Sequence, residues 1–260
     1  MAATDEHPLL VNRQHIPCTL DGGVAARAAI GLIVLATDHT IEHEWRSVIP
    51  SLDGVAVFHS RIMNSSTIDP ETLAAMEAGL AHCTEVLRPG ERIDVVAYGC
   101  TSGAMVIGPE NVAAHVHSVR PGVAVTNPIT AALAALKTLG AQRIALLTPY
   151  IDEVNQWMRG YIIEGGIDVP VMGSFTIGVD DEVARISEQS IEDALVELAS
   201  ADDVDAAFVA CTSLRVCRIV ERAEARLGKP VTSSNHALLW HSLRLAGVDD
   251  PLPGLGRLFA

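Results

Sequence analysis

A short segment that contains a cysteine occurs twice in the chain, at positions 94–103 and 205–214. Each copy has an aspartate, four mostly apolar residues, one small residue and then Cys-Thr-Ser, so that Cys100 and Cys211 occupy equivalent places. The two cysteines are about 110 residues apart, which is the size of a small α/β domain. We therefore predict two similar lobes, each of which presents a thiol where a buried strand ends.

Two thiols that face one another can move a proton. One thiolate can abstract a proton from the carbon next to a carboxylate while the opposite thiol delivers a proton from the other side, which inverts the centre. Alternatively, one thiolate can add to a carbon–carbon double bond and leave after rotation. Because each cysteine follows a strand and precedes a helix, we expect backbone N–H groups and a helix N-terminus to lower the thiol pKa below the free value of about 8.5.

Hydroxyl groups flank both cysteines. Thr101, Ser102, Thr212 and Ser213 offer hydrogen-bond donors that suit a substrate carboxylate or an enolate-like intermediate. The structural alternative is that each cysteine is a small buried hydrophobe and each Thr-Ser pair caps a helix. Duplication of the whole segment favours a function for both copies.

The elements that would position these residues are those of an α/β fold, with helices packed on parallel sheets. Short aliphatic runs predict eight buried parallel strands, at 29–36, 54–58, 93–98, 123–126, 143–148, 169–175, 205–210 and 230–233. Apolar residues at every third or fourth position predict helices between them, including 70–87, 129–139 and 190–199.

The chain is expected to divide at Asn127-Pro128 and to return near Val231. The first lobe then comprises residues 1–127 together with 231–260, and the second comprises 128–230. Ligands of such sheets bind outside the carboxyl ends of the strands, where both Cys-Thr-Ser segments fall. The predicted site is therefore the cleft between the lobes.

Composition excludes several classes of function. A net charge of −14 and a pI of 5.0 provide no basic surface for a nucleic acid. Hydrophobic runs are all shorter than the roughly 18 residues of a membrane span, and the first residues lack a signal-peptide pattern, so we expect a cytoplasmic protein. Five sparse cysteines are typical of reduced thiols. Nucleotide-binding glycine motifs are absent.

Two further patterns contain residue types that could bind a metal ion or a carboxylate. His39, Glu42 and His43 form an H-x-x-E-H pattern, which binds zinc in some proteases, but the chain offers no recognisable third ligand, and we predict no metal. His59 and Arg61 follow a strand, where the arginine could hold a carboxylate or the two could form a surface pair.

Three residues in the part of the chain after Cys211 are weaker candidates for the site. Asn235 and His236 follow the last main strand and could line the site, although packing is favoured for His236. Cys217 is expected to pack inside the helix that follows Cys211.

Four segments together resemble the aspartate/glutamate racemase superfamily. They are the paired Cys-Thr-Ser segments, residues 31–40, residues 147–150 and residues 230–240. The resemblance extends from about Gly31 to Gly247 and is strongest to the branch that contains maleate cis-trans isomerase, arylmalonate decarboxylase and racemase-like proteins of ectoine utilisation. It implies two Rossmann-like lobes related by a pseudo-twofold axis, no metal or organic cofactor, and Cys100 and Cys211 as the catalytic pair. Arylmalonate decarboxylases typically have glycine at the first position, so Cys100 argues against that activity.

The same resemblance bears on the substrate. Tyr150 matches a substrate-binding tyrosine of maleate isomerases, whereas Asp38 and Asp180 stand where those enzymes have asparagine. A carboxylate repels a dianion, so these aspartates disfavour maleate and suit an amine-bearing substrate. The Ala-Thr-Asp-His-Thr stretch resembles the ectoine-utilisation branch and implies an amino-acid-like intermediate, such as acylated diaminobutyrate. Alternatively, both aspartates cap helices, and Asp181 lies beside Asp180.

These inferences predict a cofactor-independent racemase or isomerase of a small carboxylate. The alternatives are a maleate cis-trans isomerase that acts by covalent cysteine addition, and a non-catalytic protein that binds a small carboxylate in the same cleft. The expected partner is a small molecule, without nucleic acid or membrane. Homo-oligomers are common among enzymes of this size, although the sequence identifies no interface.

Overall fold

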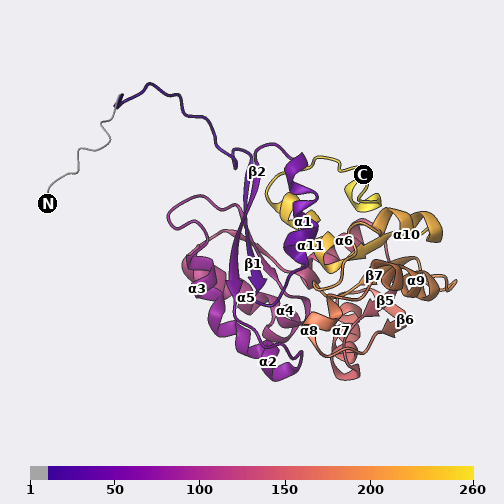
Figure 1. Cartoon of the computed structure of the whole chain (residues 1–260). Helices are drawn as coiled ribbons and strands as arrows, with labels where there is room; N and C mark the ends of the chain where they lie inside the picture. The colour runs from indigo at the N-terminus through magenta and orange to yellow at the C-terminus, as the bar shows by residue number, and fades with distance from the viewer. Residues whose placement is uncertain (1–10) are drawn as a thin grey trace.

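The computed structural model describes residues 11–260, which form two four-stranded parallel sheets with helices around them (Figure 1). The strands of the first sheet are β1 (Ala28–Leu35), β2 (Val55–Ile62), β3 (Val95–Gly99) and β4 (Ala124–Thr126). Those of the second are β5 (Arg143–Thr148), β6 (Asp168–Ser174), β7 (Ala206–Val209) and β8 (Val231–Ser233). The spatial orders, β2-β1-β3-β4 and β6-β5-β7-β8, are equivalent. The predicted two-lobed α/β fold is confirmed.

The inner strands form because their aliphatic runs are buried on both faces of each sheet, whereas the edge strands β2 and β6 are partly exposed. All eight residues of β1 are buried, as are all residues of β3 and β7. Strands of this kind occur in parallel sheets that helices cover on both sides. Cys100 directly follows β3, and Cys211 comes two residues after β7, so equivalent strands carry both cysteines to the carboxyl edges of the sheets.

Eleven α-helices and three short 3₁₀ segments complete the described part of the chain. The α-helices are α1 (Ile41–Arg46), α2 (Pro70–Ala75), α3 (Leu80–Glu85), α4 (Thr101–Ile107), α5 (Pro109–Val119), α6 (Pro128–Thr138), α7 (Asp152–Glu164), α8 (Asp180–Val183), α9 (Glu188–Ala199), α10 (Val220–Leu227) and α11 (Ser234–Leu245). The 3₁₀ segments are Ile49–Ser51, Met76–Gly79 and Arg257–Phe259.

The single helix predicted at 70–87 is broken in the structure. The 3₁₀ segment Met76–Gly79 separates α2 from α3. A Cβ atom at Gly79 would lie 2.9 Å from Cγ1 of Ile62, so the chain approaches β2 where a side chain has no room. Apolar periodicity continues through this break and therefore did not reveal it.

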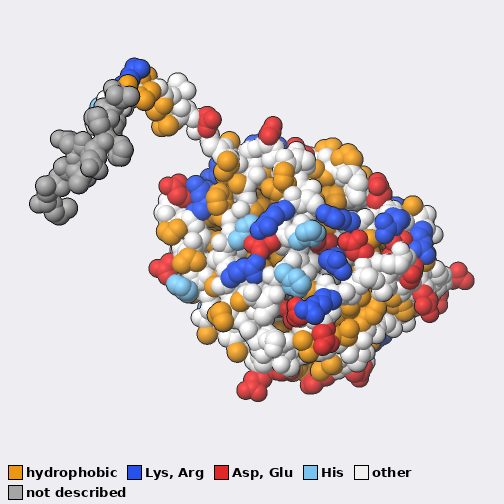
Figure 2. Space-filling model, viewed as in Figure 1, with side chains coloured by type: hydrophobic (Ala, Val, Ile, Leu, Met, Phe, Trp, Pro, Cys, Tyr) orange, Lys and Arg blue, Asp and Glu red, His pale blue; other side chains and the backbone are white. Residues whose placement is uncertain are grey.

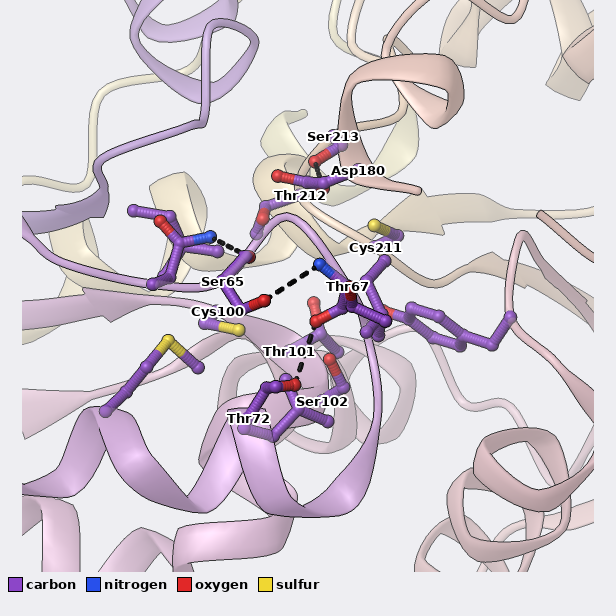
Figure 3. A pocket seen from close by; sticks show the side chains of 16 residues that line it. Ser65, Thr67, Thr72, Cys100, Thr101, Ser102, Asp180, Cys211, Thr212 and Ser213 are labelled. Atoms are coloured by element: carbon purple, nitrogen blue, oxygen red, sulfur yellow. Dashed lines mark hydrogen bonds between the residues drawn. The ribbon is translucent and has the colours of Figure 1, made fainter. Parts of the chain in front are cut away.

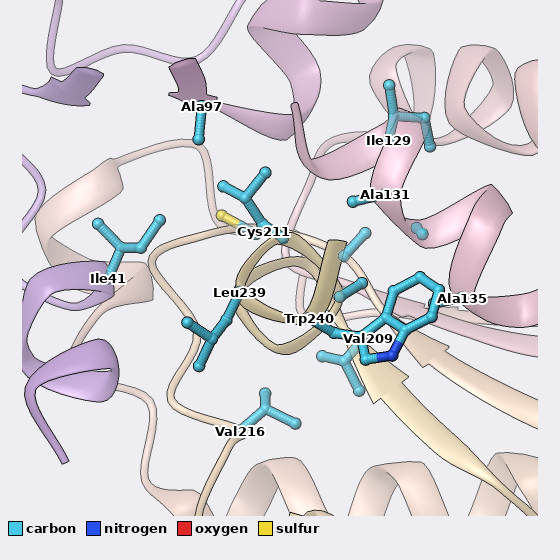
Figure 4. Close-up of a cluster of buried hydrophobic side chains, with 14 of the residues drawn as sticks. Ile41, Ala97, Ile129, Ala131, Ala135, Val209, Cys211, Val216, Leu239 and Trp240 are labelled. Atoms are coloured by element: carbon cyan, nitrogen blue, oxygen red, sulfur yellow. The ribbon is translucent and has the colours of Figure 1, made fainter. Parts of the chain in front are cut away.

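The two lobes exchange helices. β8 pairs with β7, and α11 then packs on β3 and on α6. Residues 231–233 thus complete the second sheet, and the helix that packs on the first sheet begins at Ser234. Residues 1–10 of the predicted first lobe lie outside the described part. Side chains of α6 and α11, including Ile129, Ala135 and Leu239, belong to the same buried core as Val209 of β7 (Figure 4).

The segment that follows β2 reaches across to the second lobe. Thr67 forms an antiparallel bridge with Val179, and the Ile68 N–H donates to the Gly178 carbonyl at 3.2 Å. The Asp180 N–H donates to the carbonyl of Ser66 at 3.3 Å. Residues 63–69, which we call the crossing loop, thus join the two lobes over the predicted cleft.

The surface is mixed in charge. Lys and Arg side chains are interspersed with Asp, Glu and His across the face shown in Figure 2. Many of these groups form ion pairs, including Arg61 with Glu42 and Arg185 with Asp181. Among residues 11–260, no helix has the length and apolar character needed to cross a membrane.

Candidate active site

Cys100 lies at the N-terminus of a helix, as predicted. It is the N-cap residue of α4, and its Sγ accepts a hydrogen bond from the Gly103 N–H at 3.2 Å. A Cβ atom at Gly103 would lie 2.8 Å from this sulfur, so glycine is required beside it. The local sequence Cys-Thr-Ser-Gly therefore turns the thiol toward backbone donors.

Cys211 has a different backbone setting. Its φ is +109°, a region that residues other than glycine rarely adopt, and its N–H donates to the Ser234 hydroxyl at 3.0 Å. A turn follows, and α10 begins only at Val220. The helix N-terminus predicted at the second cysteine is therefore absent. Cys217 is buried, as expected, but lies in this turn and not in a helix.

The two thiols line one pocket between the lobes, to which both repeated segments contribute (Figure 3). The pocket contains every predicted site residue except Asp38. Its lining is formed by Leu35, Asn64, Ser65, Thr67, Ile68, Thr72, Leu73, Met76, Cys100, Thr101, Ser102, Tyr150, Asp180, Cys211, Thr212 and Ser213. Hydroxyl groups surround the two sulfur atoms, and the crossing loop covers them (Figure 3).

Burial in this pocket changes the acidity of both thiols. Cys100 is 4% exposed and Cys211 is 6% exposed. Burial raises the pKa of Cys100 to about 12, although the Gly103 N–H acts in the opposite direction. Burial, followed by the charge of Asp180, likewise raises the pKa of Cys211 to about 12. The pKa of each thiol is thus raised, contrary to the predicted lowering, because burial outweighs the nearby N–H groups.

Tyr150 lies close to both thiols. Its loop is fixed because its carbonyl accepts hydrogen bonds from Asn155 Nδ2 at 2.8 Å and Ser174 Oγ at 2.6 Å. Burial, and then the neighbouring Cys211 and Cys100, raise the pKa of the Tyr150 phenol well above its usual value. The side chain is consequently a neutral hydroxyl donor between the two halves of the site.

Asp180 is the carboxylate that faces the pocket. Its two oxygens accept hydrogen bonds from Ser213 Oγ at 2.6 Å and Thr37 Oγ1 at 2.7 Å. Asp181 is exposed instead, near His39 and Arg185. The pocket lining in the described chain contains no lysine, arginine or histidine, so Asp180 is its charged group.

Asp38 lies behind the pocket and does not line it. Its Oδ1 accepts hydrogen bonds from the N–H groups of Thr40 at 2.7 Å and Ile41 at 2.9 Å, at the start of α1. Asp38 therefore holds the backbone just before α1, although the N-cap residue of this helix is Thr40. The Oδ2 atom is buried without a partner. Burial raises the pKa of Asp38 to about 6, and these two N–H groups oppose the rise.

Comparison with known proteins identifies the family. The family model for arylmalonate decarboxylase matches residues 30–259. The chain belongs to the arylmalonate decarboxylase family. It is 30% identical to maleate isomerase from Nocardia farcinica, over 88% of this chain and 94% of that protein. It is also 30% identical to arylmalonate decarboxylase from Bordetella bronchiseptica, over 90% of this chain and 98% of that protein.

Solved structures of the family have the same fold. A maleate isomerase from Pseudomonas putida S16 aligns with a TM-score of 0.81 at 24% identity, over 89% of this chain and 98% of that one. A serine mutant of the Nocardia farcinica maleate cis-trans isomerase, with a covalently bound succinylcysteine intermediate, aligns with a TM-score of 0.79 at 26% identity and the same coverage. These relatives are isomerases and decarboxylases, which confirms the expected enzyme.

The zinc pattern does not form a metal site in this family member. His39 and His43 are exposed, and Glu42 pairs with Arg61 and Arg46. Among the residues that the structure describes, no cluster of three or more His, Cys, Asp or Glu side chains is arranged for a metal ion.

His59 and Arg61 do not line the pocket. β2 continues to Ile62, beyond its predicted end at Phe58, so both residues lie within the strand. The Arg61 guanidinium donates to the carbonyls of Leu35 at 3.0 Å and Asp38 at 2.9 Å. It therefore supports the carboxyl end of β1 from outside the pocket.

His236 is a packing residue, as favoured. Its ring nitrogens contact Thr232 Oγ1 at 3.0 Å and the Leu255 carbonyl at 2.8 Å. Burial lowers its pKa to about 4, so the ring is neutral. The neighbouring Asn235 also lies outside the pocket, and its Nδ2 donates to the Thr212 carbonyl at 2.8 Å.

Sequence reasoning missed the contribution of the crossing loop and α2. Asn64, Ser65, Thr67 and Thr72 line the pocket. Asn64 Nδ2 donates to Thr37 Oγ1 at 2.8 Å, and this hydroxyl in turn donates to Asp180. The polar run Asn-Ser-Ser-Thr at positions 64–67 follows the true end of β2 and could have indicated these residues. The predicted strand ends at Phe58, so the run does not follow it directly.

Replacing Asp38 by asparagine is expected to stabilise the protein near neutral pH. A carboxyl whose pKa is raised by folding stabilises the protein fully below its unfolded pKa of about 3.9, and this contribution is lost as the pH rises through about 6. At pH 7 the free energy of unfolding of Asp38→Asn should exceed that of the wild type by about 1 to 3 kcal/mol. Urea unfolding at several pH values measures this difference. A difference that does not change between pH 4 and pH 7 would contradict the argument.

Proposed function

We propose that this chain is a cofactor-independent racemase or epimerase of a small amino-acid-like carboxylate, with Cys100 and Cys211 as its acid/base pair. The observation that carries the proposal is that one thiol from each lobe lines a single pocket whose charged lining group is Asp180. The membership of an enzyme family that contains isomerases supports the reaction type.

The reaction needs only proton transfer. One thiolate takes the α-proton, so that the C–H bond breaks, an S–H bond forms and the electron pair passes into the substrate carboxylate. The opposite thiol then gives its proton to the other face of the carbon, where a C–H bond forms and a thiolate remains. Thr101, Ser102, Thr212 and Ser213 provide the donors for the carboxylate, whose negative charge increases in the intermediate. Tyr150 contacts the substrate between the two thiols.

Asp180 favours a substrate with a protonated amine. The negative charge of Asp180 contributes to the raised pKa of both thiols. A cation beside this carboxylate would offset that charge and so make it easier for a thiol to lose its proton. Asp38 adds to the negative potential from behind the pocket. A dianion without an amine meets repulsion at the same place. An acylated diaminobutyrate from ectoine degradation belongs to the favoured class.

The second candidate is a maleate cis-trans isomerase. Its support is the similarity to the Nocardia farcinica maleate isomerase, for which a succinylcysteine intermediate has been observed. In this scheme one thiolate adds to the double bond, so that a C–S bond forms, the π bond breaks and its electron pair passes into the neighbouring carboxylate. The adduct rotates about the resulting single bond, and return of the electron pair restores the double bond and expels the same thiolate. Asp180 argues against this substrate because it faces the pocket as a carboxylate.

The test is incubation with single enantiomers of amino acids and N-acyl amino acids, and separately with maleate, in deuterated water followed by ¹H NMR. We expect deuterium at the α-carbon together with loss of optical purity. Fumarate formed from maleate would support the second candidate. Conversion of none of these compounds would overturn both.

An Asp180→Asn protein is expected to lose about a hundredfold in kcat/KM toward an amine-bearing substrate, because the buried charge-assisted contact is removed. Iodoacetamide should nevertheless alkylate Cys100 and Cys211 faster at pH 8 than in the wild type, since the charge of Asp180 raises both thiol pKa values. Steady-state kinetics and peptide mapping by mass spectrometry measure the two effects.

Asp181→Asn provides the matched control, because that carboxylate is adjacent in sequence and exposed. It should leave both readouts near the wild-type values. Equal effects of the two substitutions would show that a general change of charge, rather than the position of Asp180, is responsible.

A further inference from the structure

The Ser234 hydroxyl connects the two cysteine segments. Its Oγ accepts a hydrogen bond from Thr101 Oγ1 at 2.8 Å and another from the Cys211 N–H at 3.0 Å. Thr101 is the residue after Cys100, so one oxygen atom is hydrogen-bonded both to the neighbour of Cys100 and to the backbone of Cys211. Ser234 is 0% exposed and does not line the pocket, which excludes direct contact with a substrate.

The position of this hydroxyl is itself well defined. Ser234 is the first residue of α11, and the Ser233 hydroxyl caps this helix by accepting from the His236 N–H at 3.3 Å. The helix packs on β3, the strand that leads to Cys100, while β8 immediately before it pairs with β7, the strand that leads to Cys211. Ser234 is therefore anchored to both sheets at once.

Cys211 needs such an anchor more than Cys100 does. Cys100 is held by the first turn of α4, whereas Cys211 has a positive φ and no helix behind it. A conformation of this kind is costly and persists only where neighbouring groups hold it in place. The bond from the Cys211 N–H to Ser234 is one of these constraints, and it acts on the strained residue itself.

We propose that Ser234 is a positioning residue that sets Cys211 relative to Cys100 for proton transfer. The inference rests on the proposed function, because only a reaction that uses both thiols on one carbon requires their mutual placement. Misplacement of one reacting group by a fraction of an ångström lowers the rate of the chemical step more than it lowers substrate affinity. Loss of the hydroxyl should therefore lower kcat and leave KM nearly unchanged.

The experiment compares Ser234→Ala with Ser242→Ala in the full chain. Ser242 lies on the same helix and is equally buried, but its Oγ has no hydrogen-bond partner, so its removal breaks no bond. For each variant we would measure kcat and KM on the substrate found by the deuterium experiment, and the thermal unfolding midpoint. We would also measure the alkylation rates of Cys100 and Cys211 by iodoacetamide at pH 10, which require no substrate.

The expected result is a fall in kcat of tenfold or more for Ser234→Ala, with KM within twofold of the wild type and Ser242→Ala unchanged. A wild-type kcat in Ser234→Ala, or an equal loss in both variants, overturns the inference. If the wild-type protein converts no substrate, the proposed function is wrong, and the positioning role of Ser234 is then tested by the alkylation rates alone. A ratio of Cys211 to Cys100 alkylation that rises at least threefold in Ser234→Ala alone supports the positioning role, and an unchanged ratio overturns it.

Discussion

Replacing either Cys100 or Cys211 by alanine is expected to reduce isomerisation at least about a thousandfold, because one face of the substrate carbon then lacks its proton carrier. The fold should survive, since each substitution removes one buried sulfur from a core that is otherwise intact. The measurement is the rate of loss of optical purity for each variant, with circular dichroism as the check on folding.

Exchange with deuterated water makes this prediction sharper. In a single variant the remaining thiol faces one side of the carbon, so it should exchange the α-proton of one enantiomer with retention of configuration. Cys100→Ala and Cys211→Ala should then act on opposite enantiomers. Normal racemisation by Cys100→Ala would refute the two-thiol scheme. Exchange of the same enantiomer by both variants would show that the thiols share one face.

A Glu44→Ala protein is expected to lose about 3 to 5 kcal/mol of unfolding free energy. Glu44 is buried, and its Oε1 accepts from the N–H groups of Val216 and Cys217, each at 2.7 Å. Its Oε2 accepts from Asn235 Nδ2 at 2.7 Å. Removal of the carboxylate leaves all three donors without this acceptor in the interior. Urea unfolding followed by fluorescence or circular dichroism measures the loss.

Glu42→Ala is the matched control, because Glu42 is on the same short helix and forms its ion pairs near the surface. Its effect should be below about 1 kcal/mol. Equal losses in the two variants would mean that the donors of the 211–217 turn find other partners when Glu44 is absent. The Glu44→Ala protein should also have altered kinetics, because the turn that it supports begins at Cys211.

The sequence predicts the sheets well because their physical signal is local. A parallel strand that is buried on both faces must be a short aliphatic run, and each of the eight predicted runs forms a strand. The arrangement in two lobes was predicted from the duplication, since two copies of one segment imply equivalent positions in two similar sheets. Pocket residues adjacent to the cysteines followed directly, and Tyr150 and Asp180 followed from the family resemblance.

The features that could not be predicted depend on contacts between distant segments. The crossing loop bonds to residues 178–180, and no local pattern shows that its residues line the pocket beside the thiols. The same holds for Glu44, which directly follows the zinc-like pattern of residues 39–43 and whose partners are more than 170 residues away. Local reasoning also treated the two cysteines as equivalent, whereas the turn after Cys211 separates it from α10.

This inequality of the two halves has a thermodynamic consequence. Cys100 is held by the first turn of a helix and Cys211 by a strained turn, so the two enantiomers of a substrate with one stereocentre would meet different acids and bases. Enantiomers have equal free energies in solution, and the Haldane relation therefore makes kcat/KM the same in both directions. The asymmetry of the protein can therefore appear only as equal changes in kcat and KM. The enantiomer with the lower KM must have a kcat that is lower by the same factor.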